Sequence, residues 1–351
     1  MTQMTPANRN QPRRIITLMS LAAVLALNTI VEAQTDRVYP LTGSAISGTV
    51  AKTSAQGVQL KKGSGTQSFM AGEIKKILYD GDPAALTKGR EFAIDGQYDQ
   101  ALENLAGMDL DSLPRAVIKA DAVFYRAMCS GKLALAGKKD KKAAAVEMLS
   151  FASKYRDSWH FYDAAKILGD LALALGNTDD ALKFYGSLRS APSATAKIDS
   201  VYLTGMAQMR AGDIATAIAQ FDKVIGLKVD SVSAARLQSL AKAGKATAFA
   251  IENKPDEGLE LVSALIADMG PTDIEMAART YNAQGANYEA KGDAEGALLA
   301  YLHTHLMFSS QSDSHAVALS KLVELWPKVG KPERGAEAKQ ELKQLYPGFG
   351  Q

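Results

Sequence analysis

Cysteine, tryptophan and aromatic side chains in general are scarce in this sequence of 351 residues. It has one cysteine, two tryptophans and an aromatic content of 7%. A single cysteine cannot form an internal disulfide, and no Cys/His spacing typical of a structural zinc site occurs. The low aromatic content disfavours a β-sandwich, because strands prefer branched and aromatic side chains. We expect Cys129 to be a buried apolar side chain within a helix.

The chain also lacks an excess of charge of either sign. Its 40 basic and 38 acidic residues give a formal net charge of +2. Residues 1–33 contain three arginines and one glutamate, a net of +2, so the rest of the chain is neutral. Binding to nucleic acid depends on clustered basic side chains that neutralise phosphates. We therefore expect no nucleic-acid partner.

Sequence motifs of catalysis and cofactor binding are absent. There is no phosphate-binding Gly-Lys-Ser/Thr loop, no His-Glu-x-x-His and no Gly-x-Ser-x-Gly. Of the four histidines, His303 and His305 are two residues apart, and on a helix such a pair faces different sides. The other two are His160 and His315. The sequence therefore predicts a protein that is not an enzyme, with no cofactor and no metal site.

The N-terminal segment lacks the roughly 20 consecutive apolar residues that a membrane span needs. Three arginines precede an apolar run over residues 18–27, and Val31, Glu32 and Ala33 form a small-x-small cleavage site. This pattern predicts a signal peptide over residues 1–33. The mature chain is then secreted or periplasmic, with no permanent membrane span.

Residues 37–83 differ in character from the rest of the chain. Short alternating runs at 45–50, 57–60, 68–70 and 74–79 are separated by turns rich in glycine and serine. This is typical of successive hairpins and predicts a small β module, either a sheet or a barrel. A core of this size is marginal alone, so we expect the module to lean on the first helices.

Beyond residue 83 the sequence is mainly helical and repetitive. A turn residue recurs every 36 to 41 positions, at Gly96, Gly137, Gly176, Gly212, Asn253, Gly292 and Gly330. Seven positions before it stands a small residue, as at Gly89, Gly169, Gly205, Ala246 and Gly285, and nine positions after it a large one, as at Tyr185, Phe221 and Tyr301. Periods of this size indicate stacked helix pairs, with small residues where two helices cross closely. We predict a mainly α fold, an α-solenoid of about seven helix pairs over residues 84–347.

These units resemble tetratricopeptide repeats. The match is best over residues 278–309, where the family's signature spacing holds Tyr281, Gly285, Tyr288, Gly292, Ala297 and Tyr301. The period is longer than the family's usual 34 residues, and the unit around Gly137 indicates an insertion. The resemblance implies an extracytoplasmic member that binds protein or peptide partners.

The resemblance also implies a concave face, lined mainly by the first helix of each pair, that grips peptide segments. The family's groove positions correspond here to Lys166, Asp170, Tyr202, Met206, Met209, Arg279, Asn282 and Glu289. Tyr202, Met206 and Met209 follow one helical stripe, which is either an exposed anchor for an apolar segment or ordinary core. On the first interpretation, Lys166 and Arg279 attract carboxylates of the partner.

The function expected from these observations is a protein–protein interaction scaffold or adaptor of the cell envelope. The alternative is a periplasmic protein that binds solutes or glycans, which a cluster of exposed aromatic side chains would favour. The only two tryptophans, Trp159 and Trp326, are far apart in the sequence.

Overall fold

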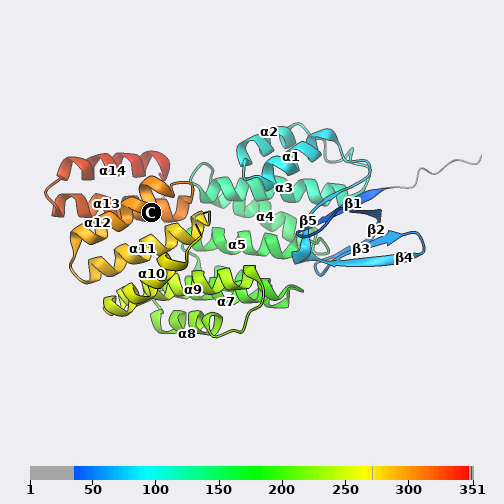
Figure 1. Ribbon diagram of the computed structural model, residues 1–351. Coiled ribbons are helices and arrows are strands. Elements are labelled where there is room, and N and C mark those ends of the chain that lie inside the picture. Colours follow the sequence, from blue (N-terminus) through cyan, green and yellow to red (C-terminus); the bar gives the residue numbers. More distant parts are fainter. Residues whose placement is uncertain (1–34, 271, 348, 350–351) are drawn as a thin grey trace, which may run out of the picture. The chain divides into compact units, whose positions relative to one another are not determined.

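A small sheet is followed by paired helices in the computed structural model, which describes residues 35–270, 272–347 and 349 (Figure 1). The expected signal peptide, residues 1–33, lies outside the described residues. The fold class predicted from the sequence is confirmed. The described residues form a helical solenoid of seven pairs preceded by a five-stranded sheet.

The sheet is antiparallel throughout, with the strand order β4-β3-β2-β1-β5. Its strands are β1 (Asp36–Pro40), β2 (Ile46–Ser54), β3 (Gly57–Lys62), β4 (Gly65–Met70) and β5 (Ile74–Leu78), and a short 3₁₀ turn η1 (Ala71–Glu73) precedes β5. Four of these strands match the alternating runs of the sequence. Strand β1, which lies between β2 and β5, was not among them, because its five residues end in proline and carry little apolar alternation.

Each of the seven helix pairs packs as an antiparallel hairpin whose two helices contact each other. The pairs are α1 (Ala84–Ile94) with α2 (Tyr98–Ala106), α3 (Ala116–Leu135) with α4 (Lys141–Lys154), α5 (Phe161–Ala174) with α6 (Thr178–Ser187), α7 (Ala194–Arg210) with α8 (Ile214–Ile225), α9 (Val232–Ile251) with α10 (Pro255–Asp268), α11 (Ile274–Ala290) with α12 (Ala294–Met307), and α13 (Ser312–Lys328) with α14 (Pro332–Leu345). A 3₁₀ turn η2 (Leu188–Ser190) follows α6.

The seven turn residues predicted from the sequence all end a first helix in the left-handed conformation. Their φ angles run from 58° at Asn253 to 84° at Gly212. Asparagine tolerates this region better than other residues with a Cβ, which explains why one turn can do without glycine. The second helix then begins at a capping side chain: Asn177, Asp213 and Asp293 each accept a hydrogen bond from the backbone N–H three residues on.

Close helix crossings explain the small residues seven positions before each turn. A Cβ added at Gly169 would lie 2.3 Å from a ring carbon of Tyr185, and one at Gly285 would lie 2.7 Å from the ring of Tyr301. Both tyrosines are buried and fill the space that the missing side chain leaves. The pairing of a small and a large residue that the spacing indicated is therefore the packing unit of the array.

The insertion indicated around Gly137 is confirmed. Helix α4 begins four residues after this glycine, at Lys141, whereas α6, α8 and α12 begin two residues after theirs. Asp140 caps the displaced helix by accepting a hydrogen bond from the backbone of Ala143. Ala144, seven residues after Gly137, is buried in the same way as Ala181, which lies five residues after Gly176.

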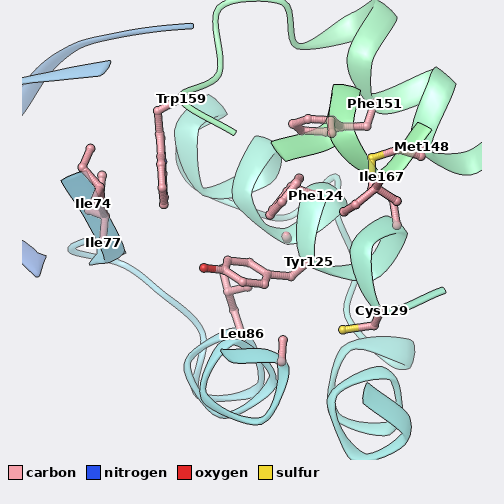
Figure 2. Close-up of a cluster of buried hydrophobic side chains, with 14 of the residues drawn as sticks. Ile74, Ile77, Leu86, Phe124, Tyr125, Cys129, Met148, Phe151, Trp159 and Ile167 are labelled. Carbon is pink, nitrogen blue, oxygen red and sulfur yellow. The ribbon is translucent and has the colours of Figure 1, made fainter. Parts of the chain in front are cut away.

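The sheet and the first three helix pairs share one hydrophobic core. Figure 2 shows Ile74 and Ile77 of β5 facing the same cluster as Leu86 of α1 and Tyr125 of α3. Cys129 lies in this cluster, is fully buried as expected, and has its pKa raised to about 12 by that burial. The sheet thus leans on the first helices, as its small size predicted.

A buried carboxylate reinforces this junction. The Asp36 carboxylate accepts hydrogen bonds from the backbone N–H groups of Val50 and Asp80, at 2.7 and 2.8 Å. Arg115, the residue before α3, donates to both oxygens of the same carboxylate at 2.6 and 3.1 Å. One carboxylate therefore ties β1 to β2, to the segment after β5 and to the start of α3.

Candidate functional site

First helices of successive pairs lie side by side over the second half of the array. Helix α7 contacts α9, α9 contacts α11, and α11 contacts α13. Figure 1 shows α7, α9 and α11 in this order from green to orange. Side chains on the same face of neighbouring first helices can therefore meet across one repeat.

Oppositely charged side chains bridge these helices. On α5, Lys166 Nζ donates to Asp199 Oδ2 of α7 at 2.5 Å. On α11, Arg279 donates from Nε to Glu275 Oε1 at 3.1 Å and from Nη2 to Asp313 Oδ2 of α13 at 2.8 Å. These ion pairs connect α5 with α7 and α11 with α13.

Arg236 of α9 makes a similar connection to the start of α11. It donates to the two carboxylate oxygens of Asp273 at 2.6 and 2.9 Å, and to Glu275 Oε2 at 2.8 Å. Burial opposes the ionisation of Glu275, but the nearby Arg279 and the hydrogen bond from Arg236 outweigh it and lower the pKa of Glu275 to about 2. Glu275 is thus ionised at neutral pH and holds two arginines at once.

We call this set the first-helix charge cluster: Lys166, Asp199, Arg236, Asp273, Glu275, Arg279 and Asp313. Its four carboxylates outnumber its three cations. The face is therefore slightly acidic and already paired, which differs from the expectation that free cations at Lys166 and Arg279 await a partner's carboxylates. The physical reason is that each cation meets a carboxylate of the neighbouring helix.

Tyr202 is not an exposed anchor. It is only 4% exposed and packs against Phe221, with ring centroids 6.2 Å apart. Burial raises the pKa of its hydroxyl to about 12. The contacts of α7 with α8 and α9 cover this side chain, so for Tyr202 the core interpretation of the stripe is the correct one.

Met206 and Met209 continue the stripe from Tyr202 and are half-buried. Both pack against the same hydrophobic cluster as Tyr202 while keeping part of their surface accessible. Methionine is flexible and polarisable, so these two side chains suit a surface that adapts to an apolar group.

The other predicted groove residues are also engaged within the chain. Asn282 Nδ2 donates to the backbone carbonyl of Ser314 on α13 at 2.9 Å. Glu289 pairs with Lys321 of α13 at 2.9 Å. Both contacts hold α11 against α13 and are half-buried.

Asp170 of α5 lies near Lys166 of the charge cluster, but its hydrogen bond is made within its own helix pair. Its Oδ1 accepts a hydrogen bond from the Tyr185 hydroxyl at 2.8 Å. Burial raises the pKa of Asp170, against the opposing attraction of Lys132 and Lys166. Asp170 therefore holds the Tyr185 ring in place at the crossing of α5 and α6.

Sequence reasoning missed five members of the charge cluster: Asp199, Arg236, Asp273, Glu275 and Asp313. A signal was nevertheless present. The paired residues are separated by 33 positions in Lys166–Asp199, by 37 in Arg236–Asp273 and by 34 in Arg279–Asp313. Opposite charges about one repeat apart on first helices would have indicated these pairs.

Exposed aromatic side chains, which a glycan site would need, do not occur in the described part of the chain. Every aromatic residue that the structure describes is buried or half-buried. Trp159 is buried in the core next to the sheet, and Trp326 packs against the C-terminal hydrophobic cluster. The glycan-binding alternative therefore gains no support.

Comparison with solved structures places the fold among tetratricopeptide repeats. A tetratricopeptide repeat protein from Parabacteroides merdae ATCC 43184 is similar with a TM-score of 0.51 and 17% identity, over 74% of this chain and 91% of that chain. A structure described as a functional characterisation of Pseudomonas aeruginosa pilF has a TM-score of 0.42 and 16% identity, over 66% of this chain and 93% of that one. The first of these similarities confirms the resemblance at the level of the fold.

Comparisons at the level of sequence add nothing to this. No protein-family model matches the chain, and no curated protein matches it. Within the described residues, no helix is both long and apolar enough to cross a membrane.

Proposed function

We propose that this protein is a non-enzymatic interaction scaffold that holds a peptide segment of a partner protein against the first-helix charge cluster. The observation that carries the proposal is that charged side chains along five consecutive first helices, α5 to α13, form two hydrogen-bonded groups that keep part of their surface accessible. One group joins α5 to α7, and the other joins α9, α11 and α13. Lys166 is 41% exposed and Asp313 is 55% exposed at the two ends of the cluster. Such a surface is ordered before the partner arrives, which lowers the entropic cost of binding.

The chemistry of the face suggests the kind of segment it takes. Because carboxylates outnumber cations in the charge cluster, a segment with lysine or arginine side chains is favoured over an acidic one. Met206 and Met209 lie on α7, on the same helical stripe as Tyr202 and as Asp199 of the charge cluster. An apolar side chain of the segment is therefore proposed to rest on the two methionines.

Neutralising both ends of the charge cluster tests the proposal. The double variant Lys166→Gln and Asp313→Asn should reduce recovery of partner proteins from an envelope extract by about tenfold or more, the factor that corresponds to 1.4 kcal/mol. Both side chains are at least two-fifths exposed, so the melting temperature should change little. The measurement is quantitative mass spectrometry of proteins retained by the immobilised chain.

The matched control is Lys138→Gln with Asp99→Asn. This pair is bonded at 3.0 Å, is more exposed than the test pair and lies in the first two helix pairs, away from the cluster. It removes one cation and one carboxylate, as the test variant does. Equal recovery with the two double variants would contradict a role for the charge cluster.

The proposed location is the cell envelope, as a secreted or periplasmic protein, and it rests on the leader expected at residues 1–33. If this is correct, the protein isolated from cells begins at Gln34, because the signal sequence is cleaved after Ala33. Mass spectrometry of the intact N-terminus, with the cytoplasmic fraction as a control, gives the answer. Recovery of the uncleaved chain from the cytoplasm would contradict both the leader and the location.

A further inference from the structure

Two histidines and a glutamate from three different helices meet at the C-terminal end of the array. They are His305 of α12, His315 of α13 and Glu341 of α14. Each residue offers one ligand atom, and these three atoms lie within 4.8 Å of one another. His305 Nδ1 and His315 Nε2 are 2.8 Å apart, and His305 Nε2 lies 3.9 Å from Glu341 Oε2.

The orientation of the His315 ring is fixed on the side away from His305, by Tyr346. It is only 2% exposed, and its Nδ1 is hydrogen-bonded to the Tyr346 hydroxyl at 2.8 Å. The Tyr346 ring packs edge-on against the imidazole and belongs to the C-terminal hydrophobic cluster. Histidines that bind metals usually have the second ring nitrogen engaged in this way, since this fixes the tautomer and aims the free nitrogen at the ion.

The front of the cluster is accessible. His305 is 21% exposed and Glu341 is 41% exposed. Both line a groove of about 530 Å³ between α12, α13 and α14, whose other charged side chains are Lys331, Glu333, Arg334 and Glu337. Two cations and two carboxylates leave no net repulsion for an incoming cation, and a ligand from the groove can reach an ion bound at its edge.

We propose that His305, His315 and Glu341 bind one Zn²⁺ ion, with an open coordination position facing this groove. Two imidazoles and one carboxylate form a donor set suited to zinc, and three protein ligands leave a position for water or for a side chain of a partner. The ion joins helices α12, α13 and α14 and so closes the C-terminal end of the array.

The movement that this requires of the two imidazoles is small, and the exposed Glu341 carboxylate, whose ligand atom lies within 4.8 Å of theirs, turns toward the ion. A tetrahedral ion with bonds of about 2.0–2.1 Å to both imidazoles holds the two nitrogens roughly 3.3 Å apart. The present separation of 2.8 Å is that of a direct hydrogen bond. Rotation of the partly exposed His305 side chain provides the difference while His315 stays in place on Tyr346.

The test is a titration of the full chain, carrying no histidine tag, with Zn²⁺ after treatment with a chelator. We expect one ion bound per chain by calorimetry, and a melting temperature that rises with Zn²⁺ and falls back when the chelator is added again. His305→Ala and Glu341→Gln should each weaken binding by more than about tenfold, and Tyr346→Phe by about tenfold.

Matched controls lie on the same helices. His303→Ala removes an exposed histidine of α12 that is stacked on Tyr281, and Glu337→Gln removes a carboxylate one turn earlier on α14. Both should leave zinc affinity unchanged. Three results would each overturn the proposal: no stoichiometric binding by the unaltered chain, equal weakening in His303→Ala and His305→Ala, or full affinity in Glu341→Gln. In the first case the two imidazoles form only a hydrogen bond.

Discussion

Replacing Asp121 by asparagine is expected to lower the free energy of unfolding by about 3–5 kcal/mol, the usual cost of breaking a buried ion pair from one side. Asp121 is fully buried on α3. Its Oδ2 accepts hydrogen bonds from Arg90 Nε and Nη2 at 2.9 and 2.6 Å, and its Oδ1 bonds to His160 Nε2 at 2.8 Å. Without this charge, the fully buried Arg90 guanidinium keeps only Asp82 as a carboxylate partner.

Asparagine has nearly the shape of aspartate, so the substitution leaves no cavity. The change in stability therefore reports the loss of the charge. The control is Asp111→Asn, which removes an exposed carboxylate bonded to Lys119 and should leave the denaturation midpoint unchanged. Denaturant unfolding followed by circular dichroism compares the two variants. A shift of the same small size in both would show that the buried network contributes no more than a surface pair.

The difference in unfolding free energy between the wild type and Asp121→Asn should depend on pH, which gives an independent check on the role of the buried network. Burial opposes the charge on His160, but the hydrogen bond to Asp121 and the nearby Asp163 outweigh it and raise the pKa of His160 above its ordinary 6.5. The stability due to this contact is full below the unfolded-state pKa and is lost as pH rises through the folded-state pKa.

The Asp121 carboxyl titrates in the other direction. Burial opposes its ionisation, but Arg90 and His160 outweigh it and lower its pKa below the ordinary 3.8, so its contribution is lost only in more acidic solution. The difference in unfolding free energy between the wild type and Asp121→Asn should therefore be largest between about pH 4 and 6.5 and should decrease above this range. A difference that grows with rising pH would contradict this account.

Replacing Gly169 by alanine is expected to destabilise the protein by about 1–3 kcal/mol, although alanine is normally the better residue in a helix. The added Cβ would lie 2.3 Å from Cε1 of Tyr185, and the neighbouring ring atoms are at 2.6 and 2.9 Å. The ring is rigid, is buried, and is held by the hydrogen bond from its hydroxyl to Asp170. It cannot turn aside, so α5 and α6 must separate.

Gly186→Ala is the matched control, because Gly186 lies in α6 of the same pair and no atom stands within 4 Å of the Cβ it would gain. This change should be neutral or stabilise by about 0.4–1 kcal/mol, since alanine restricts the unfolded chain. The two substitutions are chemically identical and are expected to shift the midpoint in opposite directions. If both substitutions stabilise the protein, the crossing of α5 and α6 can accommodate a Cβ at position 169 and the close-packing account is wrong.

The helical architecture could be predicted from the sequence because the same local features recur in each repeat. A residue that accepts positive φ, a capping side chain after it, and a small residue opposite a large one recur at nearly fixed offsets. The pair Gly285 and Tyr301 shows this, since its spacing of 16 positions was visible before their contact was known. Repetition turns weak local signals into a strong one.

The charge cluster and the proposed zinc site leave a weaker signal in the sequence, because both depend on contacts between different repeats. His305 and His315 are ten residues apart on two helices, and the sequence shows only that His303 and His305 diverge. The sequence also did not show whether the face of α7 that carries Tyr202 is buried or exposed. A stripe at helical spacing is common to core and surface, and only the packing of α8 and α9 decides between them.

The division of the apolar core into separate clusters has a consequence for how the array opens. The largest cluster joins the sheet to the first three pairs, whereas the pairs after it are held by smaller clusters, one centred on α7 to α9 and another on α12 to α14. Amide hydrogens in α12 to α14 should therefore exchange with solvent sooner than those in α3 and α5, because units with fewer buried contacts open at lower free energy. Since the charge cluster reaches from α5 to α13, a segment bound along it would span both kinds of unit and slow exchange in the C-terminal pairs most.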